Sequence, residues 1–267
     1  MKPLAAIPAA VVNTIRGVFC DIDDTLTSGG KLSARAYAAL ERLHSAGKLV
    51  IPITGRPAGW CDHIARMWPV DAVVGENGAF YFYYDGTRKK LVQRFLFDAA
   101  ARAANRERLS AVRERILLEI PGCALASDQL YREADLAIDY CEDVPRLPLT
   151  EVDRIVALMR ASGMTAKISS IHVNGWFGDY DKLGMTRTLM QERYGVDLAR
   201  EQAEYLFVGD SPNDAPMFSF FSSSVGVANV ADFGARLAAA PAYVTSGRSG
   251  DGFVEVAERL LRKSHGV

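Results

Sequence analysis

Residues 17–27 read Gly17-Val-Phe-Cys-Asp21-Ile-Asp23-Asp24-Thr25-Leu-Thr27, an apolar run that ends at one carboxylate and continues into two more. The apolar residues predict a strand, and residues i and i+2 of an extended chain project to the same side. Asp21 and Asp23 should therefore share a small volume at the strand's carboxyl end, where open α/β sheets bind ligands. Two carboxylates that close repel each other unless a cation neutralises them. The run alone is also compatible with a strand followed by an Asp-rich turn.

Three further segments place polar groups at strand ends or helix starts. Thr54 and Gly55 follow the apolar run 49–53, and there a hydroxyl and a residue without a side chain let a phosphate oxygen approach closely. Lys182 opens a helical pattern and offers a cation. The third segment delivers two more carboxylates around a serine cap and a proline, and reads Gly209-Asp210-Ser211-Pro212-Asn213-Asp214. Each feature alone would indicate an ordinary cap or a solvated lysine, but their combination favours a phosphate site.

In this combination the chain resembles the phosphatases of the haloacid dehalogenase superfamily. Residues 21–25 are similar to the first motif of that family, Thr54 to the second, Lys182 to the third and residues 209–214 to the fourth. The segment Gly75-Glu-Asn77-Gly78-Ala79 and the ending 244–253 resemble subfamily IIB, which includes Cof-type sugar phosphatases, sucrose-phosphate phosphatase and phosphomannomutase. Asp24 departs from the pattern, because many members have glycine there, and it leaves the tuning of metal affinity open.

The resemblance implies a role for each matching residue. Asp21 would attack phosphorus and form an aspartyl-phosphate, while Asp23 would protonate the leaving group and then activate water. Mg²⁺, which prefers oxygen ligands, would be held by Asp21, the backbone carbonyl of Asp23 and Asp210, with Asp214 holding a metal-bound water. The phosphate-binding residues implied by the resemblance are Asp21, Thr54, Gly55, Lys182 and Asn213.

Strand and helix patterns alternate along the chain, which predicts a Rossmann-like, doubly wound parallel sheet. Residues 1–85 and 181–267 would form this core, and residues 86–180 an inserted α+β cap. Residues 81–84 and 91–95 predict a hairpin around Asp85 and Gly86. Helices are predicted at 107–119, 231–239 and 252–263, and a further helix is predicted to begin at Thr150, which would cap it. The first strand lacks a following GxGxxG, so a dinucleotide-binding interpretation fails.

Residues 170–176 alternate between polar and apolar, as expected of a strand in the cap. Ile171 and Val173 would pack beneath the helices of the cap. The other face would look down on the core site and contact the substrate. That face consists of Ser170, His172, Asn174 and Trp176, and Arg132 is a further substrate-contact candidate on the cap.

Composition excludes several other classes of protein. The chain has 267 residues, with 31 basic and 32 acidic ones, so no basic excess favours nucleic acid or an anionic membrane. No apolar run approaches the ~20 residues of a membrane span. The four cysteines and four histidines show no spacing typical of a disulfide framework or a zinc site. We expect a retained N-terminal arm and a cytoplasmic enzyme, and the sequence leaves the oligomeric state open.

The sequence therefore predicts a magnesium-dependent phosphatase that acts on a small phosphate monoester. A sugar phosphate is the substrate class that best matches the polar face of the cap. A phosphomannomutase-like phosphotransferase would use the same intermediate but needs cap cations for a second phosphate, and Arg132 is the only obvious one. A non-catalytic phosphosugar-binding protein would be expected to lack a carboxylate or the lysine, and none is missing.

Overall fold

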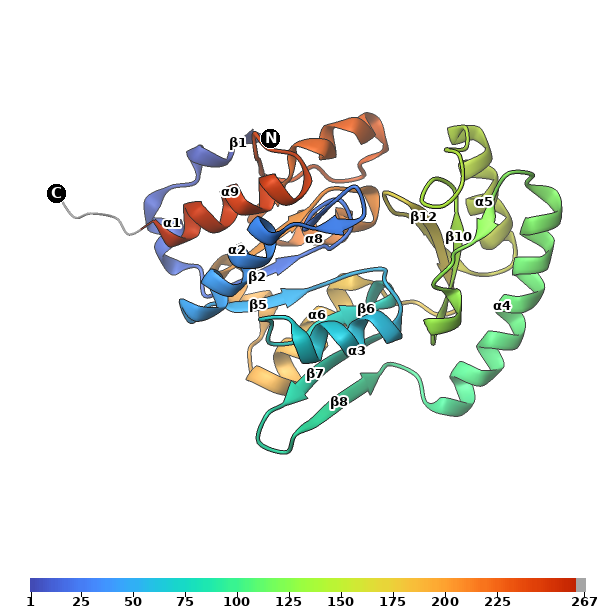
Figure 1. Ribbon diagram of the computed structural model, residues 1–267, viewed down its shortest axis with the longest axis horizontal. Helices are drawn as coiled ribbons and strands as arrows, with labels where there is room; N and C mark the ends of the chain where they lie inside the picture. Colours follow the sequence, from blue (N-terminus) through green and yellow to red (C-terminus); the bar gives the residue numbers. More distant parts are fainter. Residues whose placement is uncertain (263–267) are drawn as a thin grey trace.

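Six parallel strands form the central sheet of the computed structural model, which describes residues 1–262. Their spatial order is β1-β15-β14-β13-β2-β5, and every neighbouring pair is parallel. The strands are β1 (Lys2–Pro3), β2 (Gly17–Cys20), β5 (Leu49–Pro52), β13 (Tyr205–Gly209), β14 (Ser223–Gly226) and β15 (Tyr243–Val244). The predicted Rossmann-like core is thus confirmed, and Figure 1 shows it as the larger half of the molecule.

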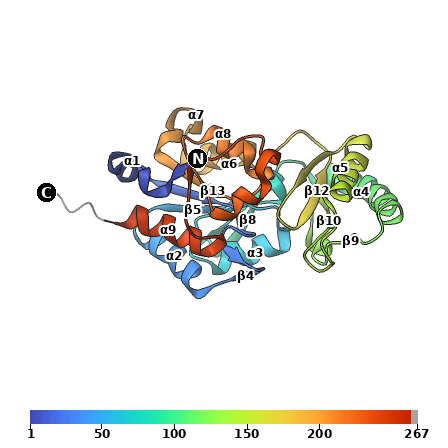
Figure 2. The same cartoon turned by 90° about the horizontal axis from the view of Figure 1, so that it is seen from above.

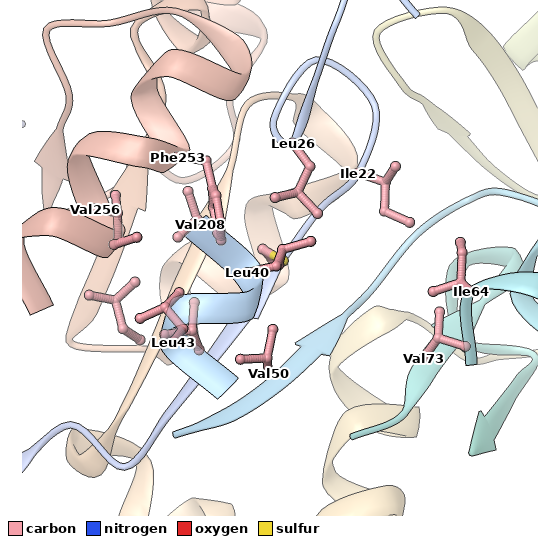
Figure 3. Close-up of a cluster of buried hydrophobic side chains, with 14 of the residues drawn as sticks. Ile22, Leu26, Leu40, Leu43, Val50, Ile64, Val73, Val208, Phe253 and Val256 are labelled. Carbon is pink, nitrogen blue, oxygen red and sulfur yellow. The ribbon is translucent and has the colours of Figure 1, made fainter. Parts of the chain in front are cut away.

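Helices cover both faces of this sheet, because side chains of successive strand residues point to opposite faces. Val18 and Cys20 of β2 belong to one apolar cluster, which the helices α2 and α9 complete (Figure 3), whereas Phe19 belongs to the cluster on the other face. In Figure 2, α6, α7 and α8 lie on one side of the strands and α2 and α9 on the other. The helices of the core are α1 (Ala9–Thr14), α2 (Ala34–Ser45), α3 (Ala58–Met67), α6 (Lys182–Tyr194), α7 (Leu198–Glu201), α8 (Ala215–Phe220) and α9 (Ser249–Leu261).

A three-stranded antiparallel sheet extends the core beyond β5. It consists of β6 (Val73–Gly75), β7 (Phe80–Asp85) and β8 (Lys90–Phe95), and a parallel bridge joins Ile53 to Val74. The β7–β8 hairpin agrees with the sequence-based prediction. Because Leu91 and Phe95 pack against the core cluster, we place the start of the inserted segment after Phe95 and not at residue 86.

The inserted segment, called the cap below, has its own sheet and its own apolar core. Its antiparallel strands lie in the order β11-β12-β10-β9. They are β9 (Ala124–Leu125), β10 (Asp135–Asp139), β11 (Thr165–Ile168) and β12 (His172–Trp176). The helices α4 (Ala99–Glu119) and α5 (Leu149–Ala161) pack on one face of this sheet, and in Figure 1 the sheet lies between these helices and the core.

Several predicted boundaries were wrong for identifiable reasons. Helix α4 begins well before residue 107, because the Asp98 side chain accepts a hydrogen bond from the Ala101 N–H and caps it there. Helix α5 follows Pro148, so Thr150 lies inside the helix and does not cap it. The stretch 231–239 is not an α-helix: Ala228–Arg236 forms 3-10 turns (η6) that break at Gly234, where φ is 49°. Helix α9 begins at Ser249 instead of residue 252, and the predicted end at residue 263 lies outside the described residues.

The remaining short elements connect these units. They are η1 (Leu4–Ala6), β3 (Thr27–Ser28), β4 (Lys31–Leu32), η2 (Glu76–Gly78), η3 (Gln129–Tyr131), η4 (Gln202–Glu204) and η5 (Pro212–Asp214). The N-terminal arm is part of the fold, because β1 pairs with β15 at the edge of the central sheet. Among residues 1–262, no helix combines the length and the apolar character that crossing a membrane requires.

Candidate active site

The carboxyl ends of three adjacent strands bring the sequence motifs together. In the order β13-β2-β5, Asp210 follows β13, Asp21 follows β2 and Thr54 follows β5 after one intervening residue. The Asp21 N–H still donates to the Val208 carbonyl at 2.9 Å, so the two aspartates leave the sheet side by side. Parallel strands end at the same edge, which is where ligands bind in this class of fold.

Asp21, Asp210 and Asp214 form a buried carboxylate cluster, with one oxygen of each within 4.8 Å of the others. Burial, and then the neighbouring carboxylates, raise the pKa of Asp21 to about 8 although the Lys182 ammonium opposes the shift. Burial and the charges of Asp21 and Asp214 likewise raise the pKa of Asp210 well above its usual range. Three carboxylates beside one ammonium group carry surplus negative charge, and an all-oxygen donor set of this kind fits Mg²⁺.

Lys182 connects two members of this cluster. Its Nζ donates to Asp21 Oδ1 at 2.6 Å and to Asp214 Oδ1 at 2.7 Å, and its side chain is only 1% exposed. Burial alone would lower the pKa of Lys182, but these two carboxylates raise it, so the ammonium stays charged. Asp181 caps α6 by accepting from the Gly184 N–H, and this places Lys182 in the first turn.

The loop after β13 is shaped by its own side chains. Asp214 Oδ2 accepts from the N–H groups of Asp210 and Ser211 at 3.0 and 3.3 Å, which completes a capping box with Ser211. Gly209 allows this, because a Cβ there would lie 2.4 Å from Asp214 Oδ2. Asn213 accepts from the Ser211 hydroxyl at 2.7 Å, so it belongs to the same loop network. Asp214 thus both orients the loop and holds Lys182.

The loop after β5 contributes Thr54 and Gly55, as the sequence predicts for their position. Thr54 is fully buried, and its Oγ1 accepts from the Arg56 N–H at 3.0 Å. A Cβ at Gly55 would lie 3.1 Å from the Asn77 side chain and 3.5 Å from Asn174 Oδ1. The site therefore needs a residue without a side chain between the core and the cap.

Two residues that the sequence reasoning missed hold the aspartates. Arg56 Nε donates to both carboxylate oxygens of Asp23, at 2.9 and 3.0 Å. Asn229 Nδ2 donates to Asp210 Oδ2 at 3.1 Å and to the Asp24 carbonyl at 3.0 Å. The position of Arg56, two residues beyond Thr54 in the same loop, was the available signal, whereas nothing in the sequence pattern pointed to Asn229.

The departure at Asp24 has a conformational counterpart. Asp24 has a φ of 55°, the left-handed region that glycine adopts freely and that aspartate tolerates better than most residues. This positive φ is consistent with the glycine that the family resemblance implies at this position, because glycine adopts the left-handed conformation without steric cost. Burial raises the pKa of Asp24, whose carboxylate adds to the negative potential felt by Asp210.

His172 and Asn174 of β12 face the aspartates across a narrow cavity. The cavity has a volume of about 10 Å³, close to the minimum for a single water molecule. Its lining residues are Asp21, Asp23, Gly55, Arg56, Ser169, Ile171, His172, Asn174 and Asn213. Ser170 instead lines a separate cavity of about 680 Å³, which also reaches Asp24 and Asp210. The cap is thus closed over the core, with more room beside Asp24 and Asp210 than directly above Asp21.

Three predictions for the cap were wrong in detail. Ile171 lines the narrow cavity instead of packing beneath the helices, because β12 begins only at His172 and Ile171 lies in the preceding turn. Trp176 is buried and stacks on Tyr180, so it serves packing. Arg132 is fully buried, and its guanidinium is bound by Asp128, Asp135 and the Gly55 carbonyl. Arg132 therefore ties the cap to the core.

Comparison with known proteins matches one segment of the chain to a family. Residues 18–104, which contain the first two motifs, match the family model of haloacid dehalogenase-like hydrolases. Over this segment the chain is similar to that family. A comparison with curated proteins found no match.

Solved structures share the fold along almost the whole chain. Thermoplasma acidophilum 0175 is 20% identical with a TM-score of 0.70, and the match covers 92% of this chain and 98% of that one. The sucrose-phosphatase from Synechocystis, solved with sucrose and phosphate, is 17% identical with a TM-score of 0.59, covering 92% and 98%. A subclass IIB sugar phosphatase is 14% identical with a TM-score of 0.59, covering 91% and 98%. The cap is thus part of the shared fold.

Proposed function

We propose that the protein is a magnesium-dependent phosphatase that cleaves a small phosphate monoester through an aspartyl-phosphate on Asp21. The observation that carries the proposal is the placement of Asp21 within 2.6 Å of a buried, charged Lys182 and within the carboxylate cluster. An anionic nucleophile, a cation that can follow the transferred phosphoryl group, and an oxygen-rich metal site are the parts that this chemistry requires.

Mg²⁺ would be held by Asp21 and Asp210, with the backbone carbonyl of Asp23 and the carboxylate of Asp214 close by. When bound, the ion would offset the repulsion between the anionic nucleophile and the anionic phosphate. The raised pKa values of Asp21 and Asp210 support this assignment, because burial and the neighbouring carboxylates disfavour their anionic forms, which a divalent cation would stabilise.

The residues of the chain would divide the chemistry into two displacements. In the first, an Asp21 oxygen forms a bond to phosphorus, the bond to the leaving oxygen breaks, and Asp23 gives its proton to that oxygen. In the second, Asp23 takes a proton from water, the water oxygen bonds to phosphorus, and the Asp21–phosphorus bond breaks. Lys182 and the Thr54 hydroxyl would donate to the phosphoryl oxygens during both transfers.

We further propose a phosphorylated sugar as the substrate class. His172 and Asn174 line the narrow cavity together with Asp21 and Asp23, and the adjacent cavity of about 680 Å³ has the size typical of a small-molecule site. Two of the structurally similar proteins are named as a sucrose-phosphatase and a sugar phosphatase. The narrow cavity above Asp21 requires that the cap move to admit such a substrate. A mutase would need a cap cation for a second phosphate: Arg132 is committed to the protein itself, whereas Arg146 lines the large cavity, so the mutase is kept as the second candidate.

A phosphate-release screen with Mg²⁺ tests this function. The panel contains sugar phosphates, phosphorylated acids and phosphopeptides, because Arg146 and Arg248 on the large cavity could also suit a second anionic group. The Asp21→Asn variant serves as the matched control for contaminating phosphatases. Release of phosphate from sugar phosphates by the native chain alone supports the proposal. Formation of an isomer without net phosphate release would favour the phosphotransferase, and inactivity on the whole panel would contradict both.

A further inference from the structure

Arg56 links Asp23 to the cap. It follows Thr54 and Gly55 in the loop after β5, and its side chain is only 4% exposed. Besides the two bonds from Nε, its Nη2 lies 2.8 Å from Asp23 Oδ1. A planar guanidinium bound in this way fixes both the position and the plane of a carboxylate.

The remaining donors of Arg56 are used by cap residues. Its Nη1 donates to Asp128 at 3.1 Å, its Nη2 donates to Glu142 at 2.5 Å, and its guanidinium lies 4.3 Å from the centre of the Trp60 ring. All three nitrogens are therefore engaged by carboxylates of the protein. Although Arg56 lines the narrow cavity, none of its guanidinium nitrogens is left to donate a hydrogen bond to a phosphate oxygen.

We propose that Arg56 is a positioning residue that orients Asp23 toward the leaving group when the cap is closed. The inference rests on the acid/base role proposed for Asp23. Two of the three carboxylates around Arg56, those of Asp128 and Glu142, belong to the cap, and the third is Asp23 of the core. Opening of the cap removes the first two and leaves Arg56 without its anchors, so Asp23 is held in place only over a covered substrate.

The carboxylates of this cluster outnumber its cation. One guanidinium faces three carboxylates. Arg56 therefore has two anionic partners on the cap besides Asp23, and its position does not depend on Asp23 alone. Arg56 would act on the geometry of Asp23, and so on every step that Asp23 assists.

Leaving groups of different basicity distinguish this role from a merely structural one. An alkoxide needs the proton of Asp23 as it departs, whereas p-nitrophenolate leaves without one. The value of kcat/KM includes only the steps up to departure of the leaving group. The ratio of kcat/KM for glycerol phosphate to that for p-nitrophenyl phosphate therefore isolates the contribution of Asp23.

The main variant is Arg56→Lys, which keeps the positive charge but loses the planar guanidinium that binds both oxygens of Asp23. We expect kcat/KM for glycerol phosphate to fall about 10²-fold, the low end of acid/base assistance, and that for p-nitrophenyl phosphate to fall less than about fivefold. Adding Arg56→Lys to Asp23→Asn should cause little further loss, because the two residues act as one unit. Glu142→Gln should produce the same preference on a smaller scale, since it weakens only the anchor on the cap.

Arg102→Lys is the matched control. Arg102 of α4 also lies between cap and core, with its guanidinium 3.8 Å from the centre of the Phe95 ring and its Nη1 donating to the Phe97 carbonyl, and its partners include neither Asp23 nor a carboxylate that binds Arg56. Its substitution should lower kcat/KM for both esters by the same factor.

The outcomes distinguish failure of the positioning role of Arg56 from failure of the acid/base role of Asp23. Equal losses on both esters in Arg56→Lys, with a selective loss in Asp23→Asn, overturn the positioning role and leave the proposed phosphatase intact. Equal losses in Asp23→Asn itself show that the acid/base assignment is wrong. If Arg56→Lys does not fold, Glu142→Gln decides, because Glu142 is partly exposed. Since Glu142 also contacts His172 at 2.8 Å, the variant is compared with His172→Ala as background: a further selective loss supports the coupling and an equal loss on both esters overturns it.

Discussion

The core site and the cap face differ in how their residues are held. In the core, Asp21, Thr54 and Asp210 each follow a strand of one parallel sheet, so the backbone itself brings them together. On the cap, His172 and Asn174 reach the site from a separate sheet whose position depends on contacts such as Arg132 with the Gly55 carbonyl. The core residues of the proposed site are thus preorganised by the sheet, whereas the cap supplies contacts that depend on its position over the core.

The core site and the cap also differ in how their charged groups are arranged. The core site concentrates three buried carboxylates beside Lys182. The cap contacts that cross to the core are ion pairs and hydrogen bonds that can be remade, including the Glu76 carboxylate with the N–H groups of Ala134 and Asp135. Substitutions in the core should therefore remove activity on every substrate, and substitutions on the cap face should change which substrate is preferred.

The largest effect is expected at the nucleophile. Asp21→Asn should abolish turnover on all esters while the protein remains folded, because the amide is nearly isosteric but cannot attack phosphorus. Phosphate release and circular dichroism measured on the same preparation test this. If magnesium-dependent activity survives in the variant, Asp21 is not the nucleophile. The expected difference between substitutions in the core and on the cap would then no longer hold.

Removal of the metal should come next. Chelation should inactivate the protein on sugar phosphates and on p-nitrophenyl phosphate alike, and added Mg²⁺ should restore both activities. Ca²⁺ should not replace it, because its longer bonds and higher coordination number displace the Asp21 carboxylate. Mg²⁺ should also raise the melting temperature of the metal-free protein, since it relieves the charge surplus at Asp21 and Asp210. Full activity after exhaustive chelation would contradict the metal site.

On the cap, the expected effect is smaller and depends on the substrate. His172→Ala and Asn174→Ala should each lower kcat/KM for the best sugar phosphate by about tenfold, the equivalent of one lost hydrogen bond, and hardly change it for p-nitrophenyl phosphate. Leu118→Ala, at an exposed position of α4, is the control and should leave both values unchanged. Similar losses on the two esters would mean that these side chains support the structure of the core site and do not recognise the substrate.

The smallest effect is expected at Asp24. Asp24→Gly should stabilise the metal-free protein by about 1 kcal/mol in chemical denaturation, because it removes a side chain from a left-handed conformation. Asp24→Asn keeps that conformation and removes only the charge, so it separates strain from electrostatics. If both variants gain equally, repulsion from Asp210 is the cause, and if neither gains, the backbone at this position carries no strain.

The positions of the candidate catalytic residues could be predicted because each lies in a short local pattern. An apolar strand that ends in Asp21, Thr54 or Asp210 defines the position of that residue once the sheet is parallel, and this follows from strand periodicity and chain order. The hairpin at 80–95 and the alternation of Val173 with its polar neighbours were predictable for the same reason. Asp24 stood out against the family pattern, but its positive φ is a property of the folded backbone.

Contacts between distant segments were beyond the reach of such patterns, and only the tertiary structure decided them. The role of Arg56 depends on Asp128 and Glu142, which lie 72 and 86 residues further along the chain, and the bond from Asn229 to Asp210 forms where 3-10 turns replace the predicted helix. Trp176 has the same alternation as His172, yet it is buried against Tyr180 because the end of β12 runs into the core. Local periodicity determines which face of an element a residue occupies, whereas the packing of one element on another determines what that face meets.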